Sequence, residues 1–441
     1  MVFVSCGVLE DPMPDPVEQE VPNNQKKDVN QNTQGSQGNN GNQSNPGLNL
    51  GKVESKALVY SPLTNLQQAV AGKEAEFSFN LLKAVSKSDV NNAAVSTFGM
   101  FTNLSMLAAG VTGETYSEIV SAMSLEGFTK EEVAAYCRTI TDELKVLDNN
   151  VAFESSNSFW YDPESARPVS GYVSLIGADF GAETYQLDNR ALNPSEPVNG
   201  WASQKSHGMI PEIVKKEKQY KWLLANVTYF EGAWTSDKYD TEPQQFTDIA
   251  GEKSEKVFFG PNSFQEMKGF NLDNDAAGLP SVLWIPYGNG AFSMALVLPP
   301  AGIGLDEFIA GLTADAFATY SANARMEDKV KFRIPVFDNS YTIGRKAAVD
   351  AFKTLGISRV FEEHGEFGGM LENPDVCVDE VVMSSQITVN EKGTKAAGAS
   401  VIGQGFSADL PKTHSFTADR PFLYAIVDIH NTVLFIGTVT K

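Results

Sequence analysis

The amino-acid composition changes abruptly near Val59, and this change limits what the chain can fold into. Between Val4 and Val59 there is no aromatic residue, and residues 21–51 consist mostly of Asn, Gln, Gly and Ser. Such a stretch cannot bury enough apolar surface to offset the entropy lost on ordering. No second stretch of this kind and no internal repeat follows it. We therefore expect a disordered tether over residues 1–58 and one folded domain over residues 59–441.

Helical patterns dominate the first part of this domain and strand patterns the later part. Residues Thr64–Lys87 carry apolar side chains at helical spacing, and Thr129 with Glu132 forms a capping box before a second helix. Another helix is predicted over Tyr341–Leu355, where Gly356 ends it. Six segments read as strands: Leu223–Phe230, Val282–Pro286, Phe292–Leu298, Val330–Phe337, Pro421–Asp428 and Thr432–Val439. This partial segregation favours an α+β fold with antiparallel or mixed sheets.

Charge and cysteine content exclude several classes of function. A formal net charge of -21 repels phosphates, so we expect no nucleic-acid partner. No apolar run approaches the length of a membrane-spanning helix. Cys6, Cys137 and Cys377 are too few for a disulfide framework and lack the close spacing of a zinc site. We expect no metal and no cofactor.

The first six residues, Met-Val-Phe-Val-Ser-Cys, resemble the end of a bacterial lipoprotein signal, although the charged start and longer apolar stretch are absent. We therefore expect Cys6 to be acylated after cleavage. The protein would then be held outside the cytoplasm on a bacterial membrane, at the cell surface or in the periplasm, with no other membrane contact. Treated as a flexible coil, the tether reaches roughly 35–40 Å. The alternative is an incidental free thiol at Cys6.

Four motifs are informative when they are taken together and in order. They are Asn199-Gly200-Trp201 with Gly208–Ile213, Leu224–Trp234 with its Phe-x-Gly-x-Trp end, Asn390–Ser400, and Phe416–Leu423. In this order they resemble the serpin family across about Leu66 to Lys441. The resemblance implies three β-sheets, about eight or nine helices and an exposed reactive-centre loop that can insert as a strand.

The Asn390–Ser400 motif resembles the serpin hinge. Its residues are Glu391, Gly393, Thr394, Ala396, Ala397, Gly398, Ala399 and Ser400. Side chains of an inserted strand alternate between faces, which would point six residues toward the helices beneath: Thr394, Ala396, Gly398, Ser400, Ile402 and Gln404. The first four are small, and no Pro or charge that would block insertion stands among the six. The alternative is a flexible surface loop with no mechanical role.

The family resemblance also places the reactive centre and the region where the sheet opens. At the usual distance from Gly393 stands Ser407, with cleavage before Ala408; Phe406 takes this place if the loop registers one residue shorter. A small residue there suits an elastase- or subtilisin-like specificity pocket, and Phe406 a chymotrypsin-like one. Three residues match positions beneath the sheet: Trp234, Asn226 and Ser96.

Two departures from the family pattern concern this opening region. Ser96 is followed by Thr97 where proline is usual, and Met383 replaces a histidine that commonly bonds to the residue aligned with Asn226. How easily the sheet opens therefore does not follow from the sequence.

The resemblance implies an inhibitor and not an enzyme. We expect a monomer that offers its loop to a serine or cysteine protease and traps the covalent acyl-enzyme by inserting the cut loop. The hydrolase patterns Gly-x-Ser-x-Gly and His-Glu-x-x-His are absent. Two alternatives stay open: a non-inhibitory serpin that binds or supports another molecule, and a surface lipoprotein whose acidic body holds a basic ligand.

Overall fold

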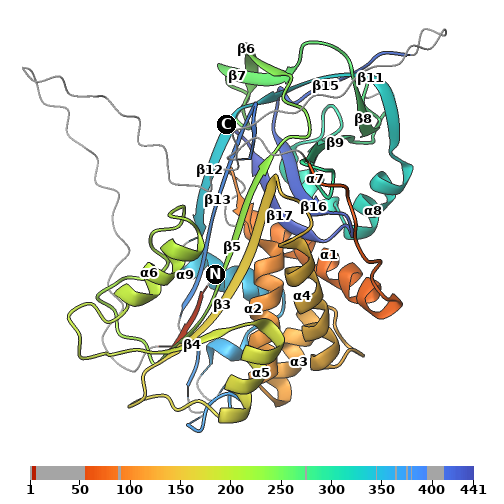
Figure 1. The fold of residues 1–441 in the computed structure, drawn as a ribbon. Helices are drawn as coiled ribbons and strands as arrows, with labels where there is room; N and C mark the ends of the chain where they lie inside the picture. The colour runs from red at the N-terminus through yellow and green to blue at the C-terminus, as the bar shows by residue number, and fades with distance from the viewer. Residues whose placement is uncertain are drawn as a thin grey trace, which may run out of the picture.

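The structure is a computed structural model that describes residues 2–5, 55–87, 91–273, 276–343, 345–362, 365–373, 376–378, 380–394 and 412–441. Within these residues the chain forms nine α-helices packed around long, twisted sheets (Figure 1). The helices are α1 (Asn65–Ser86), α2 (Thr97–Gly110), α3 (Gly113–Ala122), α4 (Lys130–Leu144), α5 (Ser170–Phe180), α6 (Glu196–Lys205), α7 (Leu305–Gly311), α8 (Ala314–Asn323) and α9 (Arg345–Thr354). No described helix is long and apolar enough to cross a membrane.

A seven-stranded sheet forms the centre of the molecule. The strand order is β12, β13, then a position shared by β14 and β1, then β5, β3 and β4. At the shared position, β14 and β1 each pair with β13 on one side and with β5 on the other. All neighbours are antiparallel except β3 and β4. The strands are β1 (Val2–Ser5), β3 (Val151–Tyr161), β4 (Glu183–Gln186), β5 (Trp222–Ala233), β12 (Phe337–Ile343), β13 (Glu380–Asn390) and β14 (Gly393–Thr394).

The remaining ten strands form a second array, in the order β2-β17-β16-β10-β9-β8-β11-β7-β6, with β15 parallel to β11. The β6–β7 hairpin pairs with the rest of this array through Ile334 and Pro335 of β11 alone, and we count it as a third sheet. The strands are β2 (Ala94–Val95), β6 (Tyr239–Thr247), β7 (Lys253–Pro261), β8 (Gln265–Phe270), β9 (Ser281–Tyr287), β10 (Phe292–Leu298), β11 (Arg325–Pro335), β15 (His414–Thr417), β16 (Phe422–Asp428) and β17 (Val433–Val439). The expected α+β fold with three sheets is confirmed.

One predicted helix begins too early. The stretch Tyr341–Leu355 is helical only from Arg345, because residues up to Ile343 belong to β12. Buried and exposed residues alternate along β12, which is the period of a half-buried strand. The strand predicted over Val330–Phe337 likewise divides at Pro335, where β11 ends before β12 begins.

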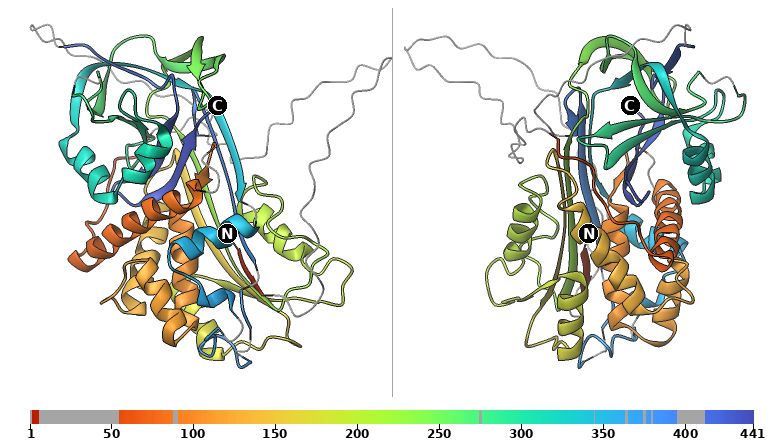
Figure 2. Two further views of the ribbon diagram at one scale, coloured as in Figure 1. Left: turned by 180° about the vertical axis from the view of Figure 1, so that it is seen from behind. Right: turned by 45° about the vertical axis from the view of Figure 1, so that its right-hand side comes forward.

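The central sheet is buried on both faces. Helices α1 to α5 and α9 cover one face and α6 the other, and Figure 2 (right) shows the sheet between them. On β5, Leu224 and Phe230 join the large core on the α2 side, whereas Leu223 and Val227 join a smaller core that includes Trp201 of α6. This two-sided burial explains why β5 reads as a continuous apolar run and not as an alternating one.

A buried carboxyl group links α1 to the last strand. Glu74 is fully buried, and its carboxyl oxygens accept hydrogen bonds from Ser78 Oγ (2.8 Å) and the Val433 amide (3.1 Å). Burial raises the pKa of Glu74 to about 8, because these bonds offset only part of the cost of desolvating its charge. The side chain is therefore mostly protonated at neutral pH.

This pKa predicts how stability depends on pH. A carboxyl whose pKa is raised from 4.5 to about 8 on folding stabilises fully below pH 4.5, and the contribution is lost as pH rises through 8. Glu74→Gln cannot ionise. At pH 7 its free energy of unfolding should therefore exceed that of the wild type by about 3 kcal/mol, and its free energy of unfolding should change less between pH 5 and 8. Denaturant unfolding at several pH values measures this. Glu76→Gln, half-exposed on the same helix, is the control, and parallel profiles for the wild-type and Glu74→Gln proteins would contradict the prediction.

Candidate functional site

The candidate site is the space between β5 and β13 in the central sheet. At one end of this space, Asn390 and Gly393 are paired and enclose a two-residue turn that holds Glu391 and the exposed Lys392. Gly393 has φ of 144°, which a side chain disfavours. Strand β14 then pairs with β13 on one side and with β5 on the other. Gly393 and Thr394 of the predicted hinge thus already lie in the sheet, whereas Glu391 lies in the turn before them.

An aromatic pair supports this end of β14. The rings of Trp234 and Tyr287 stack at 4.4 Å with planes 15° apart, and Trp234 Nε1 donates to the Asn390 carbonyl at 2.8 Å. The hydroxyls of Tyr287 and Thr394 lie 2.6 Å apart, and Thr394 is buried. Burial raises the pKa of Tyr287 above its ordinary value, so its hydroxyl keeps its proton. The residue predicted beneath the sheet, Trp234, therefore holds the hinge in place.

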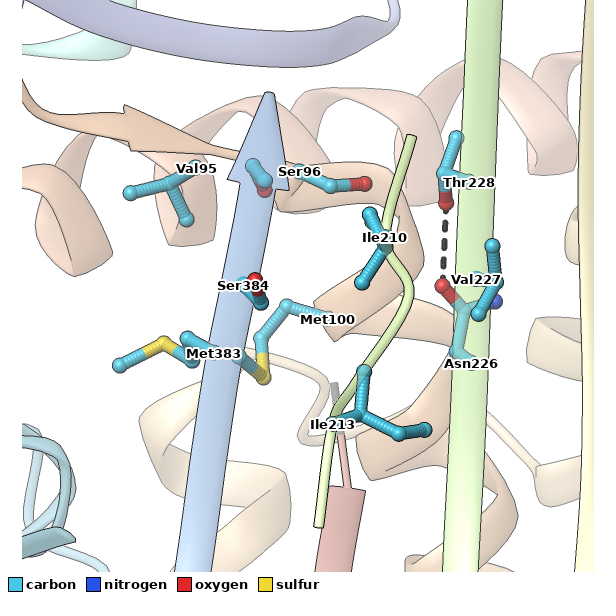
Figure 3. Close-up of a pocket in the computed structure, with 11 residues that line it drawn as sticks. Val95, Ser96, Met100, Ile210, Ile213, Asn226, Val227, Thr228, Met383 and Ser384 are labelled. Carbon is cyan, nitrogen blue, oxygen red and sulfur yellow. Dashed lines mark hydrogen bonds between the residues drawn. The ribbon is translucent and has the colours of Figure 1, made fainter. Parts of the chain in front are cut away.

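Below β14 the two strands line a small cavity of about 20 Å³ (Figure 3). Three residues of each strand form its sides: Asn226, Val227 and Thr228 of β5, and Met383, Ser384 and Ser385 of β13. Ser96 and Met100 close it from the α2 side. The structure thus brings the predicted residues Asn226 and Ser96 together at one cavity and places Trp234 at the neighbouring end of the gap.

The polar side chains that β5 contributes to the cavity are bonded to each other and to the neighbouring strand β3. Asn226 Nδ2 donates to Asn157 Oδ1 (2.8 Å) and Ser155 Oγ (3.1 Å) on β3, and Asn226 Oδ1 accepts from Thr228 Oγ1 (3.0 Å). Met383, which stands where the family has histidine, lies on the β13 side of the cavity, and its side chain extends away from β5 (Figure 3). A thioether is only a weak hydrogen-bond acceptor. The polar latch implied by the family histidine is therefore replaced by an apolar side chain.

Helix α2 begins beneath the cavity. Ser96 is its N-cap, yet its side chain makes no capping bond, and its buried Oγ has no hydrogen-bond partner in the structure. Thr97, in the place of the usual proline, donates from its Oγ1 to the Val433 carbonyl at 2.6 Å. The substitution thus adds a hydrogen bond from α2 to β17 and leaves a polar atom free at the cavity.

A segment after α6 covers the cavity from the opposite face. Ile210 and Ile213 line it there. Asn199 of α6 fixes this cover, since its Oδ1 accepts from the amides of Ile213 (2.9 Å) and Val214 (3.1 Å) and its Nδ2 donates to the Val214 carbonyl (2.7 Å). Sequence reasoning treated Asn199 only as a family marker. Its spacing from the Gly208–Ile213 turn was the available signal for this role.

Strand β1 fills the far end of the same gap. Val2–Ser5 pairs with β13 on one side and β5 on the other (Figure 1, dark red; Figure 3, lower edge). The sequence analysis did not predict this strand, because these residues were interpreted as the end of a signal peptide. Their run of consecutive apolar residues is too short to indicate a strand.

Several predicted residues lie outside the described residues. They are Cys6, the hinge residues Ala396, Ala397, Gly398, Ala399 and Ser400, and the reactive-centre residues Phe406, Ser407 and Ala408. In the described part of the chain no group of three His, Cys, Asp or Glu side chains could hold a metal ion. Buried Cys137 has a pKa raised to about 12 by desolvation, so its thiol stays protonated.

Comparisons with known proteins agree with this geometry. A family model described as serpin (serine protease inhibitor) matches residues 73–441. Serpin-Z1B of Triticum aestivum is 29% identical, with 86% of this chain and 97% of the relative covered. The native state of tengpin, a thermophilic serpin, superposes with a TM-score of 0.72 at 22% identity, covering 88% of this chain and 97% of that one. Human thyroxine-binding globulin in complex with thyroxine gives 0.71 at 18% identity, covering 85% and 99%.

Close packing of α2 against the cavity wall yields a test of how tightly the site is built. A Cβ at Gly99 would clash with Asn226 Oδ1 and lie 2.5 Å from Thr228 Oγ1. Gly99→Ala should therefore push α2 away from β5 and lower the free energy of unfolding by about 1–3 kcal/mol. The matched control is Gly72→Ala on α1, where nothing lies within 4 Å of the added atom and stability should rise by up to about 1 kcal/mol. Denaturant midpoints that shift in the same direction would contradict this.

Proposed function

Because the chain belongs to the serpin family, we propose that it is a suicide-substrate inhibitor of serine or cysteine proteases, with Ser407 and Ala408 at its reactive centre. The observation that carries the proposal is the gap between β5 and β13, whose first two ladder positions are already filled by β14. A sheet built this way offers the following residues a place to enter.

The reaction uses the nucleophile of the target protease. The protease serine or cysteine attacks the Ser407 carbonyl, the bond to the Ala408 nitrogen breaks, and Ala408 leaves as a free amine with a proton. An acyl-enzyme then links the protease to Ser407. Entry of the cut loop between β5 and β13 carries the linked protease away before water can hydrolyse the ester or thioester.

The walls of the cavity match the loop residues that would enter it. If the β14 register continues, three small residues fall between the cavity-lining residues of the two strands: Gly398, Ala399 and Ser400. Ser400 then faces the α2 side between Asn226 and Met383, and Gly398 faces the same side between Thr228 and Ser385. Larger side chains would meet Ser96 and Met100 beneath. The small size of these three residues supports the proposal, because the cavity is only about 20 Å³.

The energy available from insertion is comparable with the stability of a domain. Some 10 to 14 new backbone hydrogen bonds at about 1 kcal/mol each give on the order of 10 kcal/mol. About 15 residues at 3.3 Å each carry the cut end roughly 50 Å. The uncut chain is metastable on this proposal.

A small residue at the reactive centre favours proteases with shallow specificity pockets, such as elastase- or subtilisin-like enzymes. If Phe406 supplies the attacked carbonyl, a chymotrypsin-like enzyme is favoured instead. The chain is proposed to act as a monomer outside the cytoplasm of a bacterium, attached to the membrane through acylated Cys6.

The second candidate is a non-inhibitory serpin that binds another molecule. Strand β1 favours it, since β1 occupies ladder positions that a fully inserted loop would need. Among solved relatives, thyroxine-binding globulin was obtained with thyroxine bound. This candidate predicts cleavage of the loop without a stable complex.

Incubation with elastase-like, subtilisin-like, chymotrypsin-like and trypsin-like proteases separates the two candidates. We expect a complex that survives denaturing electrophoresis with the first or second enzyme, and a released peptide beginning at Ala408 in mass spectrometry. A peptide beginning at Ser407 would move the reactive centre to Phe406. Complete loop cleavage with no complex for any of the four enzymes would favour the non-inhibitory candidate.

A charge at the buried hinge position should turn the inhibitor into a substrate. Thr394 is 1% exposed beside Tyr287, so Thr394→Arg would bury an unpaired cation and oppose insertion. The yield of covalent complex should fall by at least about tenfold while loop cleavage continues. Lys392→Ala, on the exposed turn two residues earlier, is the control and should keep the wild-type yield. An unchanged yield for Thr394→Arg would show that the hinge does not insert at this position.

A further inference from the structure

The pairing of β1 is that of an internal strand and not of a loose end. Val2 and Phe3 oppose Val382 and Val381 of β13 and, on the other side, Ala225 and Leu224 of β5. Both side chains are 0% exposed. Four residues therefore close the central sheet over a stretch where β5 and β13 would otherwise face each other with unpaired backbone groups.

The two faces of β1 meet two different cores. Phe3 belongs to the large core on the α2 and α9 side, where its ring meets that of Phe352 edge-on at 5.6 Å. Val2 belongs to the smaller core on the α6 side, together with Trp160 and Ile213. The position therefore selects an extended segment with apolar residues at two successive positions, the second large enough to reach Phe352.

The register of β1 is the one that the reactive loop would have if it continued the ladder of β14. Strand β14 pairs Thr394 with Val389 of β13 and with Gly232 of β5. Continued without a break, this ladder sets Val401 opposite Val382 and Ala225, which are the partners of Val2. Ile402 likewise takes the partners of Phe3. Both strands run antiparallel to β5 and β13, so β1 lies in the same direction as an inserted loop.

The two segments are chemically alike at their first two positions. Val2-Phe3-Val4-Ser5 corresponds to Val401-Ile402-Gly403-Gln404. The first pair is identical, and the second places a large apolar side chain on the same face. Ladder positions 395–400, which contain the cavity, separate β14 from β1 and remain for the hinge.

We propose that Val2–Ser5 is an internal competitor of the reactive loop, which occupies the ladder positions of residues 401–404 and must leave before the loop inserts fully. This proposal rests on the loop insertion proposed above. While β1 is bound, it closes the far part of the sheet, and loop entry is limited to the hinge residues. Release of β1, or removal of residues 1–5 by the cleavage expected before Cys6, opens the remaining positions.

The first test compares the intact chain with Val2→Asp/Phe3→Asp, since neither aspartate can be buried unpaired in the two cores. Hydrogen–deuterium exchange should show the amides of Phe3–Ser5 exchanging at least about tenfold more slowly in the intact chain than in this variant. The control is Val8→Asp/Val17→Asp, with the same charge change outside β1. Rapid exchange of residues 2–5 in an intact chain whose β5 and β13 are protected would overturn the proposal.

The second test measures competition directly with a fluorescent acetyl-Val-Phe-Val-Ser amide. It should bind the Val2→Asp/Phe3→Asp variant at least about tenfold more tightly than the intact chain, and unlabelled acetyl-Val-Ile-Gly-Gln amide should displace it. If the double variant does not fold, Phe3→Ala takes its place, because loss of the ring weakens the binding of β1 and leaves the site open to the peptide. Equal binding to the intact chain and the variant, or no binding to either, would overturn the proposal.

A third measurement separates this proposal from the proposed function. The comparison uses a protease that the intact chain inhibits. Fewer molecules of the double variant than of the intact chain should be needed to trap one protease molecule, because the loop no longer has to displace β1. A chain that traps no protease yet shows protected β1 and peptide competition would contradict the inhibitor function while supporting the occupancy of the site by β1. Normal trapping with an identical stoichiometry in both chains would overturn the competition.

Discussion

Strands β5 and β13 lie far enough apart to hold one strand between them, and their backbone groups must be paired by something. Buried N–H and C=O groups without partners cost more free energy than most side-chain contacts supply. In this molecule β14 satisfies one end and β1 the other, and a cavity remains between them. The hinge, the reactive loop and the N-terminal segment all derive their roles from this single shared position.

The gap between β5 and β13 is covered on both faces, by α2 on one side and by the segment after α6 on the other. On one face, Gly99 lets α2 approach Asn226 closely, and Ser96 leaves an unsatisfied oxygen at the cavity. On the other face, Asn199 anchors the covering segment that carries Ile210 and Ile213. Met383 offers only a thioether, a weak hydrogen-bond acceptor, on the β13 side of the gap.

The sequence predicted the fold class and most strands, since these follow from local pattern and from motifs. The structure places Thr394 in the sheet and stacks Trp234 on Tyr287, whereas the hinge role of Thr394 stays a prediction. The start of α9 was misplaced because Tyr341–Ile343 carry apolar residues that fit a helix and a strand equally well. Strand β1 could not be predicted, since four residues gain their pairing energy only from two strands more than two hundred residues away. Cys6 and residues 395–411, including the reactive centre, stay predictions.

Strand β1 belongs to the same molecule as β5 and β13, between which it binds, so its binding does not weaken on dilution. A peptide supplied by another molecule binds less as its concentration falls, whereas a covalently attached segment keeps a constant local concentration, on the order of millimolar for a linker that can span the distance. The state of the gap is therefore a property of each single molecule, independent of how much protein is present. A competing peptide from outside would need to reach a similar concentration, or bind correspondingly more tightly, to take its place.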